Sequence, residues 1–326
     1  MKKTVAVIGA TGTQGGGVAR RLQQSGEWQV RGITRNANSK SAQSLKAEGI
    51  EVAAADLDDH GSLMAAFKDV HAIYAVTNFW EHIGTKGADG AGEYEAKQAI
   101  NIAQAAAHTS TLEHYVFSTL QEASAITKGK APVPHMDHKS RVDDYIRKEL
   151  PELAAKTTFL WIAFYAANLV GFPLIKPFEV PNSGGSYIWT QPTPATALLP
   201  ITGSVGHNLG VFVHAILSNP KLTLGGKYLN VKTEVLSFQQ ILDIWSEVSG
   251  KNAVYAELGV DEFIKLWGPF GKEMAMQYKF GEVAKGDWEV LAREKGLLLT
   301  PEEVGIKQGD LKGTKETFQE MKGALV

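Results

Sequence analysis

The stretch from Val5 to Gly17, VAVIGATGTQGGG, constrains the fold of this chain more than any other. Four apolar residues end abruptly at a glycine, further glycines follow at three-residue spacing, and an apolar helical period begins at Val18. This pattern predicts a strand, a tight turn and a helix. Gly9 permits the turn, Gly12 leaves room for a pyrophosphate beside the backbone, and Gly15 allows close helix–strand packing. The helix N-terminus adds unpaired N–H donors, so the stretch predicts dinucleotide binding.

Composition bounds the remaining choices. The chain has 326 residues, 44% of them hydrophobic, which is enough for one large domain or two unequal ones. A net charge of −2 argues against direct binding to nucleic acid. The absence of cysteine excludes disulfides and thiolate chemistry, and the nine histidines show no metal-ligand spacing. The longest apolar stretch, Phe159 to Ile175, is interrupted by polar and helix-breaking residues and is too short for a membrane span. We expect a cytoplasmic protein without a secretory signal, with the nucleus as an alternative location.

The residue after the second predicted strand bears on cofactor choice. Trp28 to Thr34 predicts that strand, and Arg35 follows it directly. In a doubly wound fold this position faces the adenosine ribose, where a carboxylate selects NAD and an arginine receives the 2′-phosphate of NADP. No Asp or Glu lies near the end of this strand. We therefore predict NADP(H), with NAD(H) as a weaker alternative; the other role open to Arg35 is that of a solvated loop cation.

Polar side chains also follow the third and fourth predicted strands. Gly49 to Ala55 predicts a strand that leads into the acidic segment Asp56–Asp59, of which at least one carboxylate is expected to cap the following helix. Val70 to Val76 predicts the fourth strand, and the segment Thr77–Glu81 (TNFWE) follows it. Two polar residues and then two aromatic ones stand here, where cofactor and substrate meet in an open parallel sheet.

The next segments are expected to alternate between loop, helix and strand. Gly84 to Gly92 is rich in glycine and predicts a mobile loop, and a helix with a face of small residues is expected from Glu93 to His108. His114 to Ser118 predicts the fifth strand. It ends at Ser118 and Thr119, two hydroxyl side chains that could face a substrate carbonyl.

The helix predicted from His135 to Leu150 carries the candidate catalytic pair. His135 and Lys139 are four residues apart and therefore share one helix face. Lys139 could bind the nicotinamide ribose hydroxyls, and its charge would favour proton loss from a neighbouring donor. His135 could serve as a general acid near neutral pH. The alternative is that both are solvated side chains of an amphipathic helix.

The second half of the chain is less regular. Lys156 to Ala163 predicts the sixth strand, and from about residue 171 prolines and glycines divide the chain into short pieces. We predict an α/β fold: a doubly wound, parallel-sheet Rossmann domain over residues 1–170, to which residues 205–232 return, and a smaller, partly helical C-terminal domain over residues 171–326. Later elements are expected at Asn208–Leu217, Tyr228–Val231, Ser237–Val248, Asp261–Leu266 and Glu273–Val283. A monomer and a homodimer both remain open.

The order of these motifs resembles the NmrA-like branch of the atypical short-chain dehydrogenases, which includes fungal nitrogen-repression regulators and an NADP(H) redox sensor. Six segments carry the resemblance: GATGTQGG (9–16), TRN (34–36), VTNFWE (76–81), FSTL (117–120), HMDHKSRVDDYIR (135–147) and FYAANL (164–169). They lie densely in the N-terminal half and thinly beyond it. The VTNFWE segment and the His-x-x-x-Lys helix are the most specific of them.

The resemblance implies a binding role for each segment along one NADP(H) molecule. The glycine turn would wrap the pyrophosphate, Arg35 would contact the 2′-phosphate, and Asp56 and Leu57 would flank the adenine. Residues 77–79 would line the central path, Lys139 would meet the ribose, and residues 165–168 would close over the nicotinamide. The implied cofactor-binding residues are Gly9, Thr11, Gly12, Thr13, Gln14, Arg35, Asp56, Leu57, Thr77, Asn78, Phe79, Lys139, Tyr165 and Asn168.

One departure leaves two functions open. Short-chain dehydrogenases use Tyr-x-x-x-Lys, and His135 stands here in place of the tyrosine. NmrA-like sensors share that loss and bind the cofactor without dehydrogenase activity, whereas the isoflavone-reductase group reduces its substrates with the lysine alone. The sequence favours a redox-responsive regulator with a protein partner. The alternative is an NADPH-dependent reductase of a small carbonyl, imine or enone, in which Lys139, His135 or a water protonates the product. Aromatic candidates for its apolar pocket are Phe79, Trp80, Trp161, Phe164, Tyr165, Trp267 and Phe270.

Overall fold

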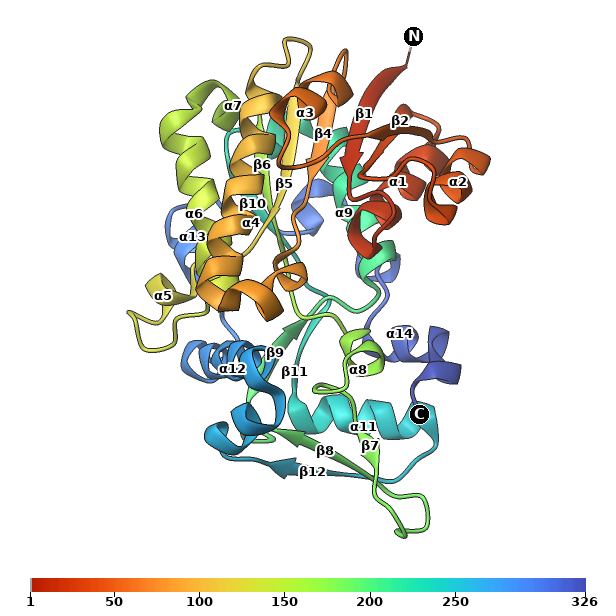
Figure 1. Ribbon diagram of the computed structural model, residues 1–326, viewed down its shortest axis with the longest axis vertical. Helices are drawn as coiled ribbons and strands as arrows, with labels where there is room; N and C mark the ends of the chain where they lie inside the picture. Colours follow the sequence, from red (N-terminus) through yellow and green to blue (C-terminus); the bar gives the residue numbers. More distant parts are fainter. Residues whose placement is uncertain (1) are drawn as a thin grey trace.

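A parallel sheet organises the N-terminal part of the computed structural model, which describes residues 2–326. Over those residues the sheet has seven strands in the order β10-β6-β5-β4-β1-β2-β3 (Figure 1). The strands are β1 (Lys3–Ile8), β2 (Trp28–Thr34), β3 (Glu51–Ala54), β4 (Ala72–Ala75), β5 (His114–Thr119), β6 (Thr157–Ile162) and β10 (Lys227–Val231). Because the strand order reverses between β1 and β4, the crevice where ligands bind such sheets lies there. The predicted doubly wound α/β fold is confirmed.

Both faces of the sheet are covered by helices, so its strands are continuous apolar runs. In β1, Val5 and Val7 belong to the core under one set of helices, and Ala6 and Ile8 to the core under the other. All four side chains are at most 3% exposed. The first set is α1 (Thr13–Ser25), α2 (Lys40–Ala47) and α9 (Val205–Ser218); the second is α3 (His60–Ala66), α4 (Ile83–Ala107), α6 (Pro134–Glu149) and α7 (Pro151–Ala155).

Two glycines of α1 are required by close backbone approach. A Cβ on Gly15 would lie 2.4 Å from the carbonyl oxygens of both Ile8 and Gly9, so only glycine lets α1 pack on the end of β1. A Cβ on Gly17 would lie 2.1 Å from the carbonyl oxygen of Gly206 in α9. Helix α9, from the second half of the chain, is thus held against α1, and β10 follows it into the sheet edge beside β6.

The loop predicted over Gly84–Gly92 is wrong. These residues form the first turns of α4, which begins at Ile83 and is kinked at Gly87, where φ is 69°. The glycine-rich composition suggested a loop, but Ile83 and Ala91 are buried with Phe79, and this burial stabilises the helix. A short 3-10 helix, η1 (Phe79–Glu81), leads into it.

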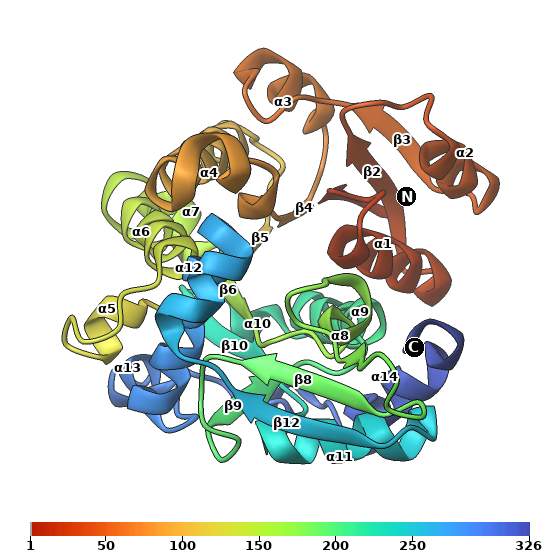
Figure 2. The ribbon, with the colours of Figure 1, turned by 60° about the horizontal axis from the view of Figure 1, so that its bottom comes forward.

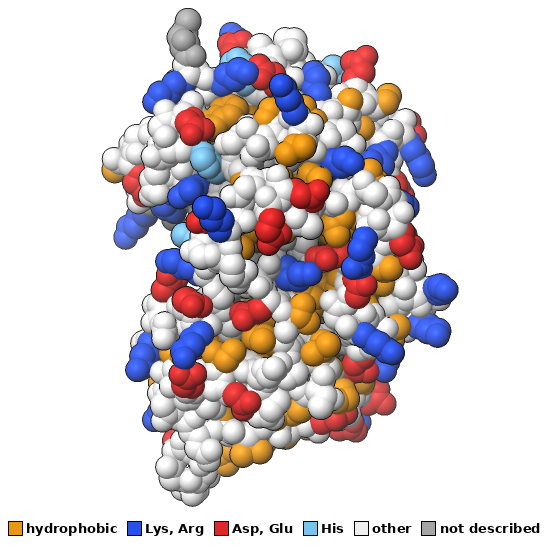
Figure 3. Space-filling model, turned by 180° about the vertical axis from the view of Figure 1, so that it is seen from behind, with side chains coloured by type: hydrophobic (Ala, Val, Ile, Leu, Met, Phe, Trp, Pro, Cys, Tyr) orange, Lys and Arg blue, Asp and Glu red, His pale blue; other side chains and the backbone are white. Residues whose placement is uncertain are grey.

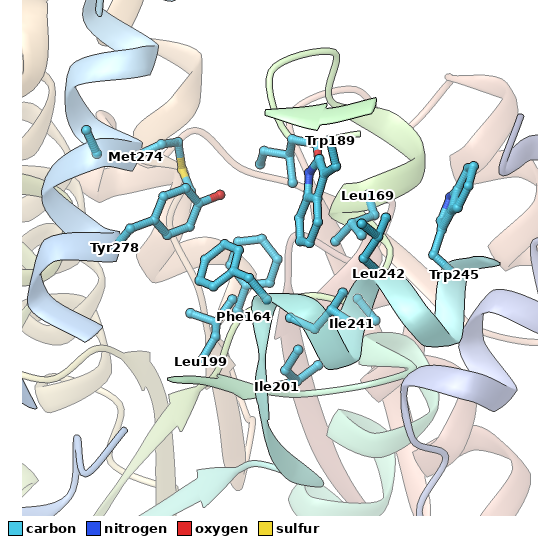
Figure 4. Close-up of a cluster of buried hydrophobic side chains, with 14 of the residues drawn as sticks. Phe164, Leu169, Trp189, Leu199, Ile201, Ile241, Leu242, Trp245, Met274 and Tyr278 are labelled. Atoms are coloured by element: carbon cyan, nitrogen blue, oxygen red, sulfur yellow. The ribbon is translucent and has the colours of Figure 1, made fainter. Parts of the chain in front are cut away.

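The C-terminal part packs small sheets and helices around a second core. Among the described residues, β9 (Leu198–Ile201) pairs with β11 (Glu234–Ser237), and β8 (Tyr187–Gln191) lies between β7 (Phe178–Glu179) and β12 (Ala253–Glu257). Aromatic and aliphatic side chains from β8, β9, α11 (Phe238–Ser249) and α12 (Val260–Ala284) fill the core (Figure 4). Helix α12 is broken at Gly268, where φ is 58° and Pro269 follows, which accounts for the two helices predicted there. Shorter helical pieces are α5 (Ala123–Ile126), α8 (Asn168–Gly171), α10 (Pro220–Thr223), α13 (Val290–Glu294), η2 (Glu302–Val304), η3 (Gln308–Asp310), α14 (Thr314–Glu320) and η4 (Lys322–Ala324).

The position of α12 matters for the site. It lies against α4 and beside α6, below the carboxyl ends of the sheet strands in the view of Figure 1 and in front of them in that of Figure 2. The C-terminal part therefore supplies one wall of the cavity at the carboxyl ends of the parallel sheet. The outer surface carries charges of both signs interspersed, as the face in Figure 3 shows. None of the helices within residues 2–326 combines the length and apolar character needed to cross a bilayer.

Candidate functional site

A cavity of about 400 Å³ lies at the carboxyl ends of β1, β4, β5 and β6. Its floor is made by Gln14 in the first turn of α1 and by residues that end or closely follow the other three strands, including Thr77, Ser118 and Phe164. Its remaining walls come from α6, from the segment after α8 and from α12. The cavity thus extends from the first turn of α1 to an apolar chamber under the C-terminal part.

The turn after β1 has the features of a phosphate site. Gly12 is the N-cap of α1, and among the described residues no side chain caps this helix end or places a carboxylate in its first turn. Its free N–H groups and dipole therefore favour an anion. A Cβ on Gly12 would lie 3.3 Å from the carbonyl oxygen of Gly9, on the exposed side of the turn. These residues fit a dinucleotide pyrophosphate, with Thr11 and Thr13 exposed beside it.

Gln14 has a structural task that the sequence did not indicate. Its Oε1 accepts hydrogen bonds from the hydroxyls of Tyr74, at 2.7 Å, and Ser118, at 2.9 Å, and its Nε2 donates to the hydroxyl of Tyr165. Burial raises the pKa of Tyr165 to about 12, so this hydroxyl is neutral at physiological pH. The Gln14 side chain therefore ties α1 to β4, β5 and the segment after β6, and only its backbone remains for a phosphate.

Directly after β2, Arg35 already has an anionic partner. Its Nη1 lies 2.5 Å from Oε1 of Glu81 in η1, and its side chain is 67% exposed. The neighbouring carboxylate raises the pKa of Arg35, which stays a cation. The pair joins the end of β2 to the segment after β4. The 2′-phosphate expected at Arg35 would have to compete with this carboxylate.

The acidic segment after β3 behaves partly as expected. Asp59 caps α3 by accepting from the backbone N–H groups of Gly61 and Ser62, which confirms the predicted cap. Asp56 stays exposed, and the carbonyl oxygen of Leu57 accepts a hydrogen bond from Asn101 at 2.9 Å. Both residues lie beyond the cavity, on the side of β2 and Arg35.

Lys139 is largely, though not fully, buried and is paired. Its Nζ lies 2.8 Å from Oε1 of Glu95 in α4, and the two side chains are 11% and 1% exposed. Thr77 donates its hydroxyl to the same oxygen at 2.8 Å, while Oε2 of Glu95 has no partner among the described residues. The solvated-lysine alternative is therefore wrong. Sequence reasoning missed Glu95; the available signal was a carboxylate four residues before Ala99, on the small-residue face of the helix.

His135 is also buried, and it contacts the C-terminal part. Its Nδ1 lies 2.6 Å from Oε1 of Glu273 in α12, and the two side chains are 8% and 1% exposed. The rings of Phe79 and Trp80 lie 5.5 and 5.3 Å from the imidazole, centre to centre. The solvated alternative fails for His135 as well. Both His135 and Lys139 line the cavity, as their shared helix face predicted.

The walls of the chamber are largely aromatic and aliphatic. Five of the seven aromatic candidates line it: Phe79, Trp80, Phe164, Tyr165 and Phe270. Trp161 instead stacks on Tyr228 at 4.4 Å, and Trp267 packs against the C-terminal core. Asn168 lines the cavity beside Tyr165, whereas Asn78 lies at its exposed edge. Sequence reasoning did not identify Met274 and Trp288, which complete the wall.

Comparison with known proteins agrees with this fold. The chain is 30% identical over 296 residues to the NmrA-like family domain-containing oxidoreductase cpsB of Aspergillus campestris, a match that covers 88% of this chain and 85% of that protein. Among solved structures it is similar to Nmra, a negative transcriptional regulator, with a TM-score of 0.76 and 21% identity over 99% of this chain and 96% of that one. It is also similar to the Citrobacter sp. triphenylmethane reductase complexed with NADP(H), with a TM-score of 0.68 and 20% identity over 98% of this chain and 99% of that one. The model of the NmrA-like family matches residues 1–296, and the chain therefore belongs to the NmrA-like family.

Proposed function

We propose that this chain is an NADPH-dependent reductase of a small, apolar carbonyl, imine or enone. The observation that carries the proposal is the cavity of about 400 Å³, which runs from the α1 turn past Lys139 into the aromatic chamber. Such a volume and lining are typical of sites for small apolar ligands. The sequence alone favoured a regulator; the chamber and the relatives named as oxidoreductases give the reductase precedence here.

Each part of the cofactor has a complementary group on the chain. The uncapped N-terminus of α1 suits the pyrophosphate, and Arg35 suits the 2′-phosphate. Lys139, held by Glu95, suits the nicotinamide ribose hydroxyls. When bound, the cofactor supplies the hydride. The chain holds the cofactor, keeps water from the apolar chamber and delivers the accompanying proton.

A direct test follows hydride transfer itself. The protein is incubated with NADPH deuterated at C4 and with a panel of aldehydes, enones and imines, whose products keep a carbon-bound deuterium, and the products are analysed by mass spectrometry. We expect one deuterium per product molecule from only one of the two C4 epimers, because a fixed nicotinamide presents a single face. Gly12→Val, which fills the pyrophosphate space, should yield no product. Tight NADPH binding without product anywhere in the panel would contradict the proposal.

A redox-responsive regulator is the second candidate. It is favoured by one observation, the histidine at the tyrosine position of the Tyr-x-x-x-Lys dyad. A sensor must bind the oxidised and reduced cofactor with unequal affinity. If both cofactor forms bound equally well, a change in their ratio would not alter how much of each form is bound to the protein. Calorimetric titration with NADP⁺ and NADPH separately measures this difference. Equal affinities would argue against the regulator.

A further inference from the structure

We infer that His135 is the proton donor of the proposed reductase and that Glu273, from the C-terminal part, is the positioning residue that orients it. This inference rests on the proposed function. It starts from a contact between residues 138 positions apart in the sequence, on α6 and α12. These two helices lie next to each other (Figure 2), and both contribute residues to the lining of the chamber.

Glu273 fixes one side of the imidazole. Its Oε1 accepts from the backbone N–H of His135 at 2.9 Å and lies 2.6 Å from Nδ1 of the same residue. The carboxylate is 1% exposed, so its charge is stabilised by these contacts rather than by bulk water. An Nδ1–H held in this way fixes the ring orientation and leaves proton exchange to Nε2.

The other side of the imidazole faces the cavity. Nε2 of His135 forms no hydrogen bond with any of the described residues, yet it is not among the fully enclosed polar atoms without a partner. Since His135 lines the cavity and its ring is flanked by Phe79 and Trp80, the remaining accessible volume beside Nε2 is that of the chamber. A substrate heteroatom in the chamber would find Nε2 as an unengaged donor.

Lys139 is the less suitable donor. Its ammonium is the counter-charge of Glu95, whose Oε2 already lacks a partner within residues 2–326. A proton lost from Lys139 would leave a buried carboxylate without its cation, which is costly. When His135 gives up its Nε2 proton, Glu273 keeps both of its N–H donors, the arrangement found in carboxylate–histidine catalytic pairs.

The step balances with NADPH as the reductant. The C4 hydride, with its electron pair, forms a C–H bond at the carbonyl or imine carbon, and the π electrons of that bond move to oxygen or nitrogen. The Nε2 proton of the imidazolium is transferred to that heteroatom, and NADP⁺ and an alcohol or amine result. The neutral imidazole then takes a proton from water, so one solvent proton is consumed per turnover.

The charged groups around His135 determine how the rate of NADPH oxidation should depend on pH. Glu273 faces it from α12, Lys139 and His138 lie on α6 itself, and Glu95 on α4 reaches it only through Lys139. The segment η1 contributes the aromatic rings of residues 79 and 80. Glu273→Gln therefore removes the one anion that contacts the imidazole within residues 2–326, and with it the favourable charge interaction of the imidazolium.

The test compares single-turnover NADPH oxidation in the wild type, His135→Gln and Glu273→Gln between pH 5 and 9, with the best substrate of the panel. Glu282→Gln is the matched control, since Glu282 lies on α12 but bonds Thr193 and Lys279 instead. We expect Glu273→Gln to bind NADPH within about twofold of the wild type and to react about ten- to a thousandfold more slowly. The alkaline limb of the plot of its rate against pH should move to lower pH, and this limb should be absent in His135→Gln. The double variant should be no slower than His135→Gln, because the pair acts as one unit.

Several results would overturn the inference. If the wild type turns over substrate and His135→Gln does so at the same rate, the inference is overturned while the proposed function stands. The same holds if Glu273→Gln is slower but its rate depends on pH as that of the wild type does. No turnover by the wild type would instead remove the proposed function and the inference with it. Should Glu273→Gln fail to fold, the wild type still tests the pair: its Nδ1 proton should resonate downfield of the amide protons in ¹H NMR and disappear in His135→Gln. The absence of that signal would overturn the pairing.

Discussion

The contact between Arg35 and Glu81 makes a quantitative prediction about cofactor choice. Arg35 lies where a 2′-phosphate is expected, but its guanidinium is 2.5 Å from the carboxylate of Glu81. NADP(H) must therefore exchange one anion for another at this arginine, whereas NAD(H), which lacks the phosphate, does not. Replacing either partner should change the affinity for the two cofactors differently, and in opposite directions for the two variants.

The magnitudes follow from the exposure of the pair. A hydrogen bond to a charged group contributes about 1.5–3 kcal/mol, so Arg35→Gln should weaken NADPH binding by roughly 10- to 150-fold. NADH binding should change by less than about twofold. An exposed ion pair contributes only about 0.2–1 kcal/mol, so Glu81→Gln should tighten NADPH binding by at most about fivefold. In the Arg35→Gln background, Glu81→Gln should have no such effect.

Fluorescence titration with NADPH and with NADH, each at 0.1 M and 0.5 M salt, measures four affinities for each of the proteins. The selectivity for NADPH should shrink at the higher salt, because the contact is exposed and therefore screened. Equal losses for both cofactors in Arg35→Gln would refute the assignment of Arg35 to the 2′-phosphate. Weaker NADPH binding in Glu81→Gln would refute the competition between the two anions.

Three further predictions concern the scaffold. Gly15→Ala should lower the free energy of unfolding by about 3 kcal/mol or more, since its Cβ would overlap two carbonyl oxygens of β1 and its turn, while Gly309→Ala, in open space, should be neutral in urea titrations. Glu95→Gln should destabilise by about 3 kcal/mol by leaving Lys139 buried without its counter-charge, and Lys139→Met added to it should recover most of the loss; a double variant less stable than the single one would contradict this. Burial lowers the pKa of His114 to about 4, below its ordinary 6.5. The contribution of the neutral His114 to the free energy of unfolding is therefore intact above pH 6.5 and is lost as the pH falls toward 4. Relative to His114→Gln, the free energy of unfolding of the wild type should fall by about 3 kcal/mol over that pH range. Parallel plots of unfolding free energy against pH for the two proteins would contradict this.

The sheet was predictable because its strands are buried on both faces. Trp28–Thr34 forms β2 with the predicted bounds, and the other sheet strands differ from prediction by one or two residues at one end or at both. Continuous apolar runs that end at glycine or a polar residue carry this information locally. The loop predicted at Gly84–Gly92 failed because its helix depends on burial against Phe79, a contact that composition does not reveal.

The candidate site was only half predictable, for a similar reason. His135 and Lys139 were found because helical spacing puts them on one face. Their partners, Glu95 and Glu273, come from other helices, one of them 138 residues away, and no local pattern links them. Distant pairs of this kind convert two apparently solvated side chains into a buried, charged centre.

The measurement that tests the central claim most directly is single-turnover oxidation of bound NADPH by the substrate panel, run beside Lys139→Met. The account predicts that the wild type oxidises bound NADPH with at least one substrate class. In Lys139→Met, which lacks the cation proposed to hold the nicotinamide ribose, we expect weaker NADPH binding and slower oxidation of the NADPH that is bound, because the nicotinamide is less firmly placed. NADPH that remains bound and unoxidised by the wild type throughout the panel, or an unchanged rate in Lys139→Met, would contradict it.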